Sequence, residues 1–269
     1  MKKNLLITLG CSFTEGVGCY GDISDHPNQP YGFLKETERN RFIDRFHEFG
    51  WPNRVGRKLG YDKVLNLGNG GSGNSLHLKL FVDKIVPKLD QIKKDYKVFV
   101  IWLMTDPTRF SFYTESHIKS FMPSLEPSNR YMAEGYLKDM KEFKIGPARE
   151  QVFLIKLSEF MFKSLDITAA FSSWSPSFMY VNKLYRSQNF LTPTFLPNMF
   201  KMEDHNISLV PGCGHPNEDG YEVIADDIVK YIKKYRPEFL PETPNLSNEL
   251  EWEWDGSHIY NPFKNSTII

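Results

Sequence analysis

Short apolar runs alternate along this chain with longer stretches in which apolar residues recur every three or four positions. Each short run is bounded by polar residues or glycine, a pattern that predicts a buried strand, whereas the longer stretches predict helices. We expect strands at residues 4–10, 63–69, 97–104 and 166–173. Residues 205–212 are either a fifth strand or an extended approach to the residues after them.

Three stretches have helical spacing: residues 75–94, 149–165 and 220–235. Pro87 is expected to kink or divide the first of these helices, and Asp219 to start the third. The apolar face expected in the second consists of Phe153, Leu157, Phe160, Met161 and Leu165. Strands alternating with helices predict an α/β fold, with a parallel sheet covered on both faces and functional residues at the carboxyl ends of its strands.

Three segments interrupt this alternation. Insertions near 19–50 and 107–148 follow the first and third predicted strands, where walls or lids of a site are often found. We therefore expect one domain over residues 1–235. Residues 236–269 form an extension that packs on the domain or on a partner, which makes it the candidate contact for an oligomer.

Composition narrows the function classes. The chain has 269 residues, of which 41% are hydrophobic and 25% charged, as in an ordinary soluble globular protein. Lys plus Arg equals Asp plus Glu at 33 each, so no nucleic-acid partner is expected. No apolar run reaches the ~18 residues of a membrane span. Residues 5–9 are too short for a signal-peptide core, so we expect no membrane contact and a cytoplasmic location.

Cysteine usage and glycine spacing exclude several kinds of site. Cys11, Cys19 and Cys213 are odd in number and form no C-x-x-C pair, so packed free thiols are expected and a disulfide framework is not. Their spacing matches no standard zinc pattern, and no metal is expected. The chain also lacks a phosphate-binding GxxxxGK[ST] loop after Gly10 and a dinucleotide-binding GxGxxG there.

Candidate chemistry gathers where the predicted strands end. Ser12 follows the first strand, a glycine-rich turn at 66–74 ends the second, and Thr105 and Asp106 end the third. His215 stands just before the last helix. A hydroxyl, a histidine base and donors for an oxyanion are the parts that acyl transfer requires.

In this arrangement the chain resembles the SGNH (GDSL-type) hydrolases, a family of esterases, lipases and carbohydrate deacetylases on a three-layer α/β/α, flavodoxin-like sheet. Four sequence blocks carry the resemblance, in the family's order. They are Gly10-Cys11-Ser12 with Gly16, Asn66 with Gly71, Leu103-Met104-Thr105-Asp106, and Gly212-Cys213-Gly214-His215-Pro216.

The resemblance implies a role for each matched residue. Ser12 would be the nucleophile and His215 the base, with the oxyanion held by the Ser12 and Gly71 amides and the Thr105 hydroxyl. Asn74 and Asp106 are weaker candidates for substrate binding, with helix or loop capping as the alternative for each. The family's aspartate after the first glycine is replaced by Cys11.

Two further family residues are replaced. Thr105 stands where the family has an asparagine, and Gly212 where it has the triad acid. A backbone carbonyl or a carboxylate from elsewhere, such as Asp255, would then orient His215. The segment Asp255-Gly-Ser-His258 fits the family's D-x-x-H pattern and is the rival for the last block.

The function that this resemblance implies is a serine esterase that removes a small acyl group, such as acetyl, from a carbohydrate or a similar polar ester. The chemistry requires no metal or organic cofactor. Two alternatives stay open: a non-catalytic binding module that keeps the fold, and an acyltransferase that uses the same serine.

Overall fold

The structure is a computed structural model of the whole chain. It describes residues 2–21, 36–113, 118–121, 145–175, 178, 181, 207–210, 214–247 and 250–254, and the statements below concern these residues.

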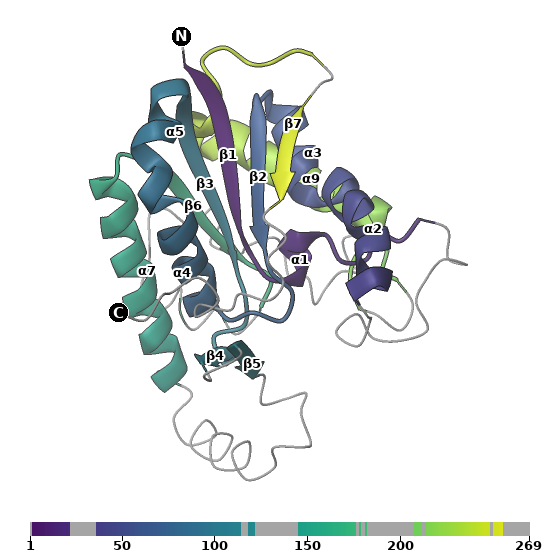
Figure 1. The fold of residues 1–269 in the computed structure, drawn as a ribbon, viewed down its shortest axis with the longest axis vertical. Coiled ribbons are helices and arrows are strands. Elements are labelled where there is room, and N and C mark those ends of the chain that lie inside the picture. The colour runs from purple at the N-terminus through teal and green to yellow at the C-terminus, as the bar shows by residue number, and fades with distance from the viewer. Residues whose placement is uncertain are drawn as a thin grey trace.

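Parallel strands form the centre of the fold (Figure 1). Four of them lie in the order β6-β3-β1-β2, and their bounds are β1 (Lys3–Gly10), β2 (Lys63–Gly68), β3 (Tyr96–Met104) and β6 (Thr168–Ser173). These are the four strands predicted from the apolar runs. A fifth parallel strand, β7 (Glu251–Trp254), pairs with β2 at the edge of the sheet. From β1 the chain continues to β2 on one side, and then returns to β3 on the other side of β1. Open α/β sheets bind ligands where the strand order reverses in this way, outside the carboxyl ends of the strands.

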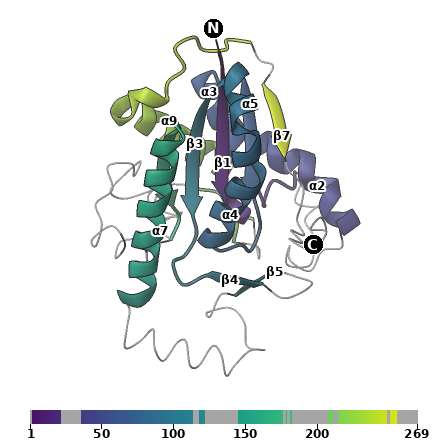
Figure 2. The same ribbon diagram turned by 60° about the vertical axis from the view of Figure 1, so that its left-hand side comes forward.

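Helices cover both faces of the sheet, as the two views show (Figures 1 and 2). On one side lie α1 (Ser12–Glu15), α2 (Glu36–Phe49), α3 (Trp51–Leu59) and α9 (Glu218–Tyr235). On the other lie α4 (Asn74–Lys84), η3 (Val86–Lys88), α5 (Leu89–Asp95) and α7 (Ile145–Ser164). The fold is therefore α/β, with a parallel sheet between helices, as predicted.

Alternation along β3 explains how two hydrophobic cores form. Phe99 and Ile101 belong to the core shared with α3 and α9, whereas Val100 and Trp102 belong to the core shared with α4 and α7. Successive side chains of a strand point to opposite faces, so an unbroken apolar run suits a strand buried on both sides.

Segments outside this alternation also join the fold. Part of the predicted insertion 107–148 forms an antiparallel hairpin of β4 (Phe110–Tyr113) and β5 (Ile118–Phe121). The predicted extension contributes η6 (Pro237–Phe239) and β7. Phe239 is fully buried, and its carbonyl oxygen accepts a hydrogen bond of 2.7 Å from the Tyr61 hydroxyl. The described part of the extension therefore packs on the domain.

Helix boundaries follow the prolines and caps. The predicted helix at 75–94 is divided, since α4 ends at Lys84 and Pro87 lies in η3. The last helix begins earlier than expected from Asp219, because the Asn217 side chain accepts a hydrogen bond from the Gly220 N–H and caps it. Of the helices in the described ranges, none combines the length and apolarity needed to cross a membrane.

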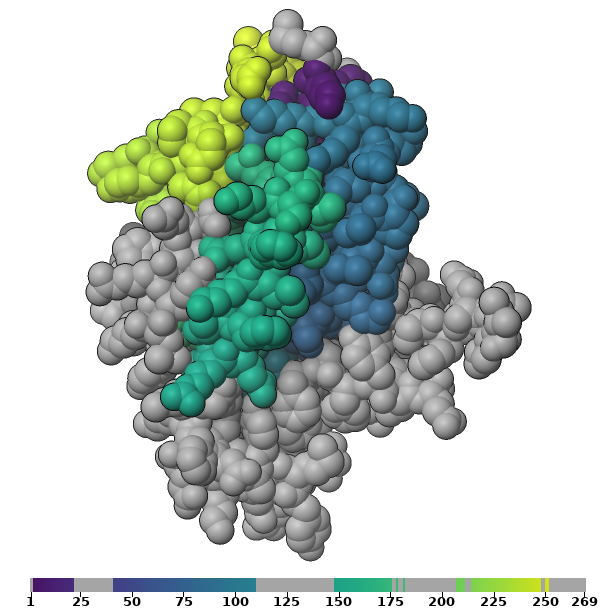
Figure 3. Space-filling view, turned by 90° about the vertical axis from the view of Figure 1, so that its left-hand side faces the viewer, coloured from purple at the N-terminus to yellow at the C-terminus, as the bar shows by residue number. Residues whose placement is uncertain are grey.

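The expected apolar face of α7 is wrong for three of its five residues, whereas Met161 and Leu165 are partly buried against the core. Figure 3 shows the outer surface of α7. Phe153, Leu157 and Phe160 on this helix are 69%, 47% and 72% exposed. The buried stripe runs instead through Ile155 and Phe162, whose ring lies 5.2 Å from that of Phe81 on α4 and packs on the sheet. Large apolar residues occur on more than one side of this helix, so spacing alone could not identify the side that meets the sheet.

A buried histidine packs against the end of β2. His47 on α2 is 2% exposed, and its Nδ1 lies 3.4 Å from the Asn66 amide nitrogen, which also donates to the Thr14 carbonyl at 2.8 Å. An amide nitrogen only donates, so Nδ1 is the acceptor. Burial lowers the pKa of His47 to about 3, and the imidazole is neutral in the folded protein.

Acidification should therefore destabilise the fold. Between pH 6.5, the ordinary pKa, and about 3, the unfolded chain binds a proton at His47 that the folded chain does not. Stability is full above this window and falls as pH decreases, by about 1.4 kcal/mol per pH unit for each such histidine. In His47→Gln, the free energy of unfolding can be measured by urea denaturation at several pH values across the window. Its decrease with falling pH should be smaller by about 1.4 kcal/mol per pH unit. An unchanged slope would contradict the neutral, buried state of His47.

Candidate active site

Ser12 lies at the carboxyl end of the central strand. β1 ends at Gly10, and α1 begins at Ser12, with Cys11 as its N-cap. The Cys11 carbonyl accepts hydrogen bonds from the N–H groups of Thr14 and Glu15 at 2.9 and 3.0 Å. The first N–H groups of a helix have no acceptor within it, and among the described residues none contacts the Ser12 N–H. The serine thus presents both a hydroxyl and an unused amide at the sheet edge.

His215 contacts this hydroxyl. Its Nε2 lies 2.8 Å from Ser12 Oγ, and both residues are partly exposed. The backbone of the histidine is fixed by a hydrogen bond of 2.9 Å from the Val210 N–H to the His215 carbonyl and by a bridge between Leu209 and Pro216. The expected contact between Ser12 and His215 is confirmed.

Aromatic rings pack beside this pair. The ring of Phe13 lies 4.8 Å from that of His215 and 5.0 Å from that of Trp174, and the Arg109 guanidinium lies 5.9 Å from the Trp174 ring. Sequence reasoning missed Phe13 and Trp174. The signal was available, since one directly follows the serine and the other directly follows a predicted strand, whose carboxyl end meets the same edge.

Three residues that bear on the orientation of His215 lie outside the described part of the chain. Asp255 is the carboxylate proposed for this role, Gly212 stands at the position of the missing triad acid, and His258 is the rival base. The role of a backbone carbonyl or a distant carboxylate in orienting the imidazole stays a prediction.

Gly71 occupies a turn held beside α1. Its φ of +78° is in the left-handed region that favours glycine, the residue is exposed, and no described acceptor contacts its N–H. The turn is tied to the Ser12 segment from two directions. The Asn69 N–H donates to the Gly10 carbonyl at 2.9 Å, and the Gly70 N–H donates to Glu15 Oε2 at 2.8 Å. The turn that carries Gly71 is therefore hydrogen-bonded to the segment that carries Ser12, and the Gly71 N–H has no acceptor among the described residues.

The structure corrects the roles of Asn74 and Thr105. Asn74 is fully buried, and the helix cap is Gly73. The oxygen of the Asn74 side-chain amide accepts a hydrogen bond from the Thr105 N–H at 2.7 Å. Its nitrogen donates to the Thr105 carbonyl at 3.1 Å and to Gln151 Oε1 at 2.9 Å. This clamp holds Thr105 in the interior, where its Oγ1 is covered and no described residue forms a hydrogen bond with it. Neither side chain faces an open site.

Asp106 is also engaged within the protein. Its Oδ1 accepts from the Thr108 N–H at 2.8 Å and from the Thr108 hydroxyl at 2.6 Å, and Oδ2 accepts from Ser175 Oγ at 2.6 Å. The carboxylate joins the loop after β3 to the loop after β6. These contacts fit the capping alternative, and the role of Asp106 in substrate binding stays a prediction.

The described cysteines are buried. Cys11 and Cys19 are both inaccessible free thiols, and burial followed by the charge of Glu218 raises the pKa of Cys19 well above its usual range. Cys213 lies outside the described residues. Within the described ranges, no group of histidine, cysteine and acidic side chains is arranged to hold a metal ion.

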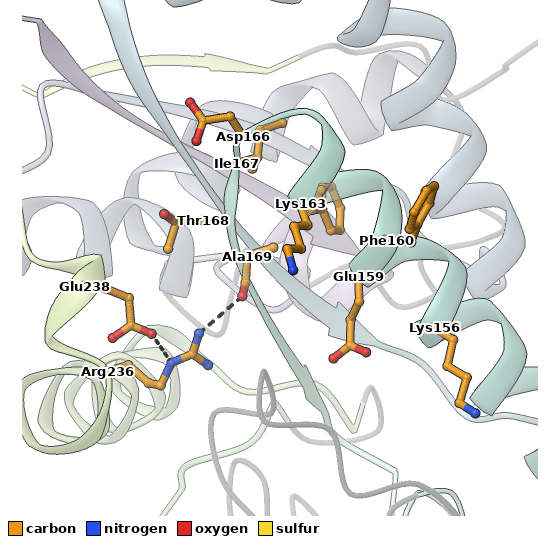
Figure 4. Close-up of a pocket in the computed structure, with 11 residues that line it drawn as sticks. Lys156, Glu159, Phe160, Lys163, Asp166, Ile167, Thr168, Ala169, Arg236 and Glu238 are labelled. Carbon is orange, nitrogen blue, oxygen red and sulfur yellow. Dashed lines mark hydrogen bonds and ion pairs between the residues drawn. The ribbon is translucent and has the colours of Figure 1, made fainter.

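A groove elsewhere on the domain is separate from this site (Figure 4). It lies between α7, the amino end of β6 and η6, and is lined among others by Lys163, Ala169 and Arg236. The Arg236 guanidinium donates to the Ala169 carbonyl at 3.3 Å and pairs with Glu238, as the dashed lines show. Ser12 and Trp174 follow the opposite, carboxyl ends of their strands.

Comparison with known proteins gives no match, whether to a protein-family model, a curated protein or a solved structure.

Gly18 lies directly against the loop that carries His215. Its φ is +116°, and a Cβ at this position would lie 2.0 Å from the Pro216 carbonyl oxygen and 3.2 Å from His215 Cβ. A side chain here would displace backbone, since no flexible group is available to move. The absence of a side chain thus lets the Ser12 and His215 segments approach each other.

Two glycine substitutions separate this close approach from backbone strain. Gly18→Ala and Gly214→Ala both place alanine at positive φ, at a cost of about 1 kcal/mol each. Among the described residues, nothing lies within 4 Å of a Cβ at Gly214. We expect Gly18→Ala to lower the free energy of unfolding by about 3 kcal/mol because overpacking adds to the strain. Equal losses in the two variants, measured by denaturant titration, would contradict the packing described.

Proposed function

We propose that this protein is a serine ester hydrolase of the SGNH type, with Ser12 as nucleophile and His215 as general base. The observation that carries the proposal is the 2.8 Å contact between Ser12 Oγ and His215 Nε2 at the carboxyl edge of a parallel sheet. A hydroxyl becomes an effective nucleophile when a positioned base accepts its proton.

The proposed reaction proceeds in two steps. Ser12 Oγ attacks the ester carbonyl as its proton passes to His215 Nε2, and the resulting oxyanion receives hydrogen bonds from the Ser12 and Gly71 amides. Collapse of this intermediate breaks the bond to the alcohol, which takes the proton from His215. Water then attacks the acyl-serine with His215 as base, releasing the acid and restoring the serine.

A small acyl group on a carbohydrate or similar polar alcohol is the proposed substrate. The resemblance to the SGNH family carries this part. Two aromatic side chains support it: the Phe13 ring lies beside His215, and the partly exposed Trp174 ring packs on Phe13 and offers an apolar surface for a sugar or acyl group. Acyl transfer to an alcohol other than water would use the same serine.

One observation favours the non-catalytic alternative. The Thr105 hydroxyl is buried, so the oxyanion would be held by two backbone donors without a side-chain donor. Loss of one donor typically costs about 3 kcal/mol of transition-state stabilisation. A binding module that kept the fold would tolerate this loss.

Substitution of the pair tests the proposal. With p-nitrophenyl acetate as substrate, Ser12→Ala and His215→Ala should each lower kcat by about 10³-fold or more, and the double variant should lose no more. Ser75→Ala is the matched control, because this exposed serine lies on α4 and belongs to none of the contacts described. Its turnover should equal that of the original protein.

A fluorophosphonate probe provides the second measurement. It should label Ser12 in the original protein and in Ser75→Ala, and label neither Ser12→Ala nor His215→Ala. Unlabelled protein without esterase activity would favour the binding module. Turnover that rises with added alcohol and yields a new ester would favour the acyltransferase.

A further inference from the structure

A second serine–histidine pair lies beneath the glycine turn. Ser72 Oγ is 2.6 Å from His77 Nε2, and the two residues are 1% and 0% exposed. Burial, with a smaller contribution from the charge of Arg109, lowers the pKa of His77 to about 3, so the imidazole is neutral.

The indole of Trp102 fixes the tautomer of His77. Trp102 Nε1 lies 3.1 Å from His77 Nδ1, and an indole N–H only donates. Nδ1 is therefore the acceptor, and the one proton of the neutral ring resides on Nε2. His77 Nε2–H then donates to Ser72 Oγ, and His77 is unable to act as a base toward this serine.

The hydrogen-bond chain continues from the Ser72 hydroxyl to the backbone. Since its oxygen accepts from His77, its own proton is directed to the Asn69 carbonyl, which also accepts from the Ser72 N–H at 3.3 Å. The other end of the same peptide unit, the Gly70 N–H, donates to Glu15 Oε2 at 2.8 Å. The Asn69–Gly70 peptide is thus held at both ends, by α4 and the core on one side and by α1 on the other.

We propose that Ser72, His77 and Glu15 are positioning residues that fix the 69–71 turn, so that the next amide, the Gly71 N–H, is held ready to bind the oxyanion. Gly71 itself has an exposed backbone and no described acceptor for its N–H. Preorganised donors stabilise a developing charge because they need not reorient during the reaction. This inference rests on the proposed hydrolase function for its catalytic consequence, and on the hydrogen-bond chain alone for its geometry.

The geometry is tested without any substrate. In the full chain labelled with ¹⁵N-histidine, the spectrum at neutral pH should show His77 with Nε2 protonated and Nδ1 unprotonated. The Gly70 amide should exchange slowly with solvent and the Gly71 amide rapidly, and Ser72→Ala should accelerate exchange at Gly70. The opposite tautomer, or exchange at Gly70 unaffected by the substitution, would overturn the inference.

The catalytic consequence is tested by kinetics of Ser72→Ala on p-nitrophenyl acetate. We expect kcat per fluorophosphonate-labelled site to fall about tenfold at unchanged KM, with a matching loss of affinity for a boronic acid that forms a tetrahedral adduct with Ser12. Normalising to labelled sites removes any loss that reflects unfolded protein.

Ser158→Ala is the control. Ser158 is fully buried on α7, and its hydroxyl also donates to a backbone carbonyl, that of Leu154 at 2.7 Å. This variant should keep its kcat per labelled site. Unchanged kcat in Ser72→Ala, or an equal fall in both variants, would overturn the positioning role. If the histidine spectrum and the amide exchange are as expected but the original protein hydrolyses no ester, the proposed function is rejected. The positioning of the 69–71 turn by Ser72, His77 and Glu15 would still hold.

Discussion

The parallel pairing of β1 with β2 on one side and β3 on the other is the constraint on which the rest of the structure depends. Gly10 is in register with both Gly68 and Leu103, and Leu103 is in register with Ser172. Because the strands end at one level, the segments that follow them begin at one edge. Ser12, the 69–71 turn and Trp174 are brought together by this register before any side chain contributes.

Side chains at this edge mostly stabilise the backbone. Asn66 joins β2 to β1 and α1, Asn74 clamps Thr105, and Asp106 ties two loops together. A buried loop must satisfy its peptide groups, and short polar side chains are well suited to that role. Under the proposed function, the described residues at this edge that are left for chemistry are one hydroxyl, one imidazole and two amides.

The strands could be predicted because a strand buried on both faces of a sheet is a continuous apolar run. The helices could be predicted because a helix buried on one side has apolar residues every three or four positions. The contact of Ser12 with His215 was likewise predictable, since both adjoin elements of known direction. Residue type gave no such guidance for Asn74 and Asp106, whose amide and carboxylate suit a ligand and a loop backbone equally well. On α7, the choice between Phe160 and Phe162 depended on tertiary packing.

Ser12 and His215 are 203 positions apart in the chain. During synthesis the serine and its strand emerge long before the histidine. The pair forms only after α9, which follows His215, has packed against the rest of the domain. Under the proposed mechanism, activity requires that α9 has packed on the domain. Formation of the sheet alone is not enough. Local release of α9 would silence the protein while most of its secondary structure persisted.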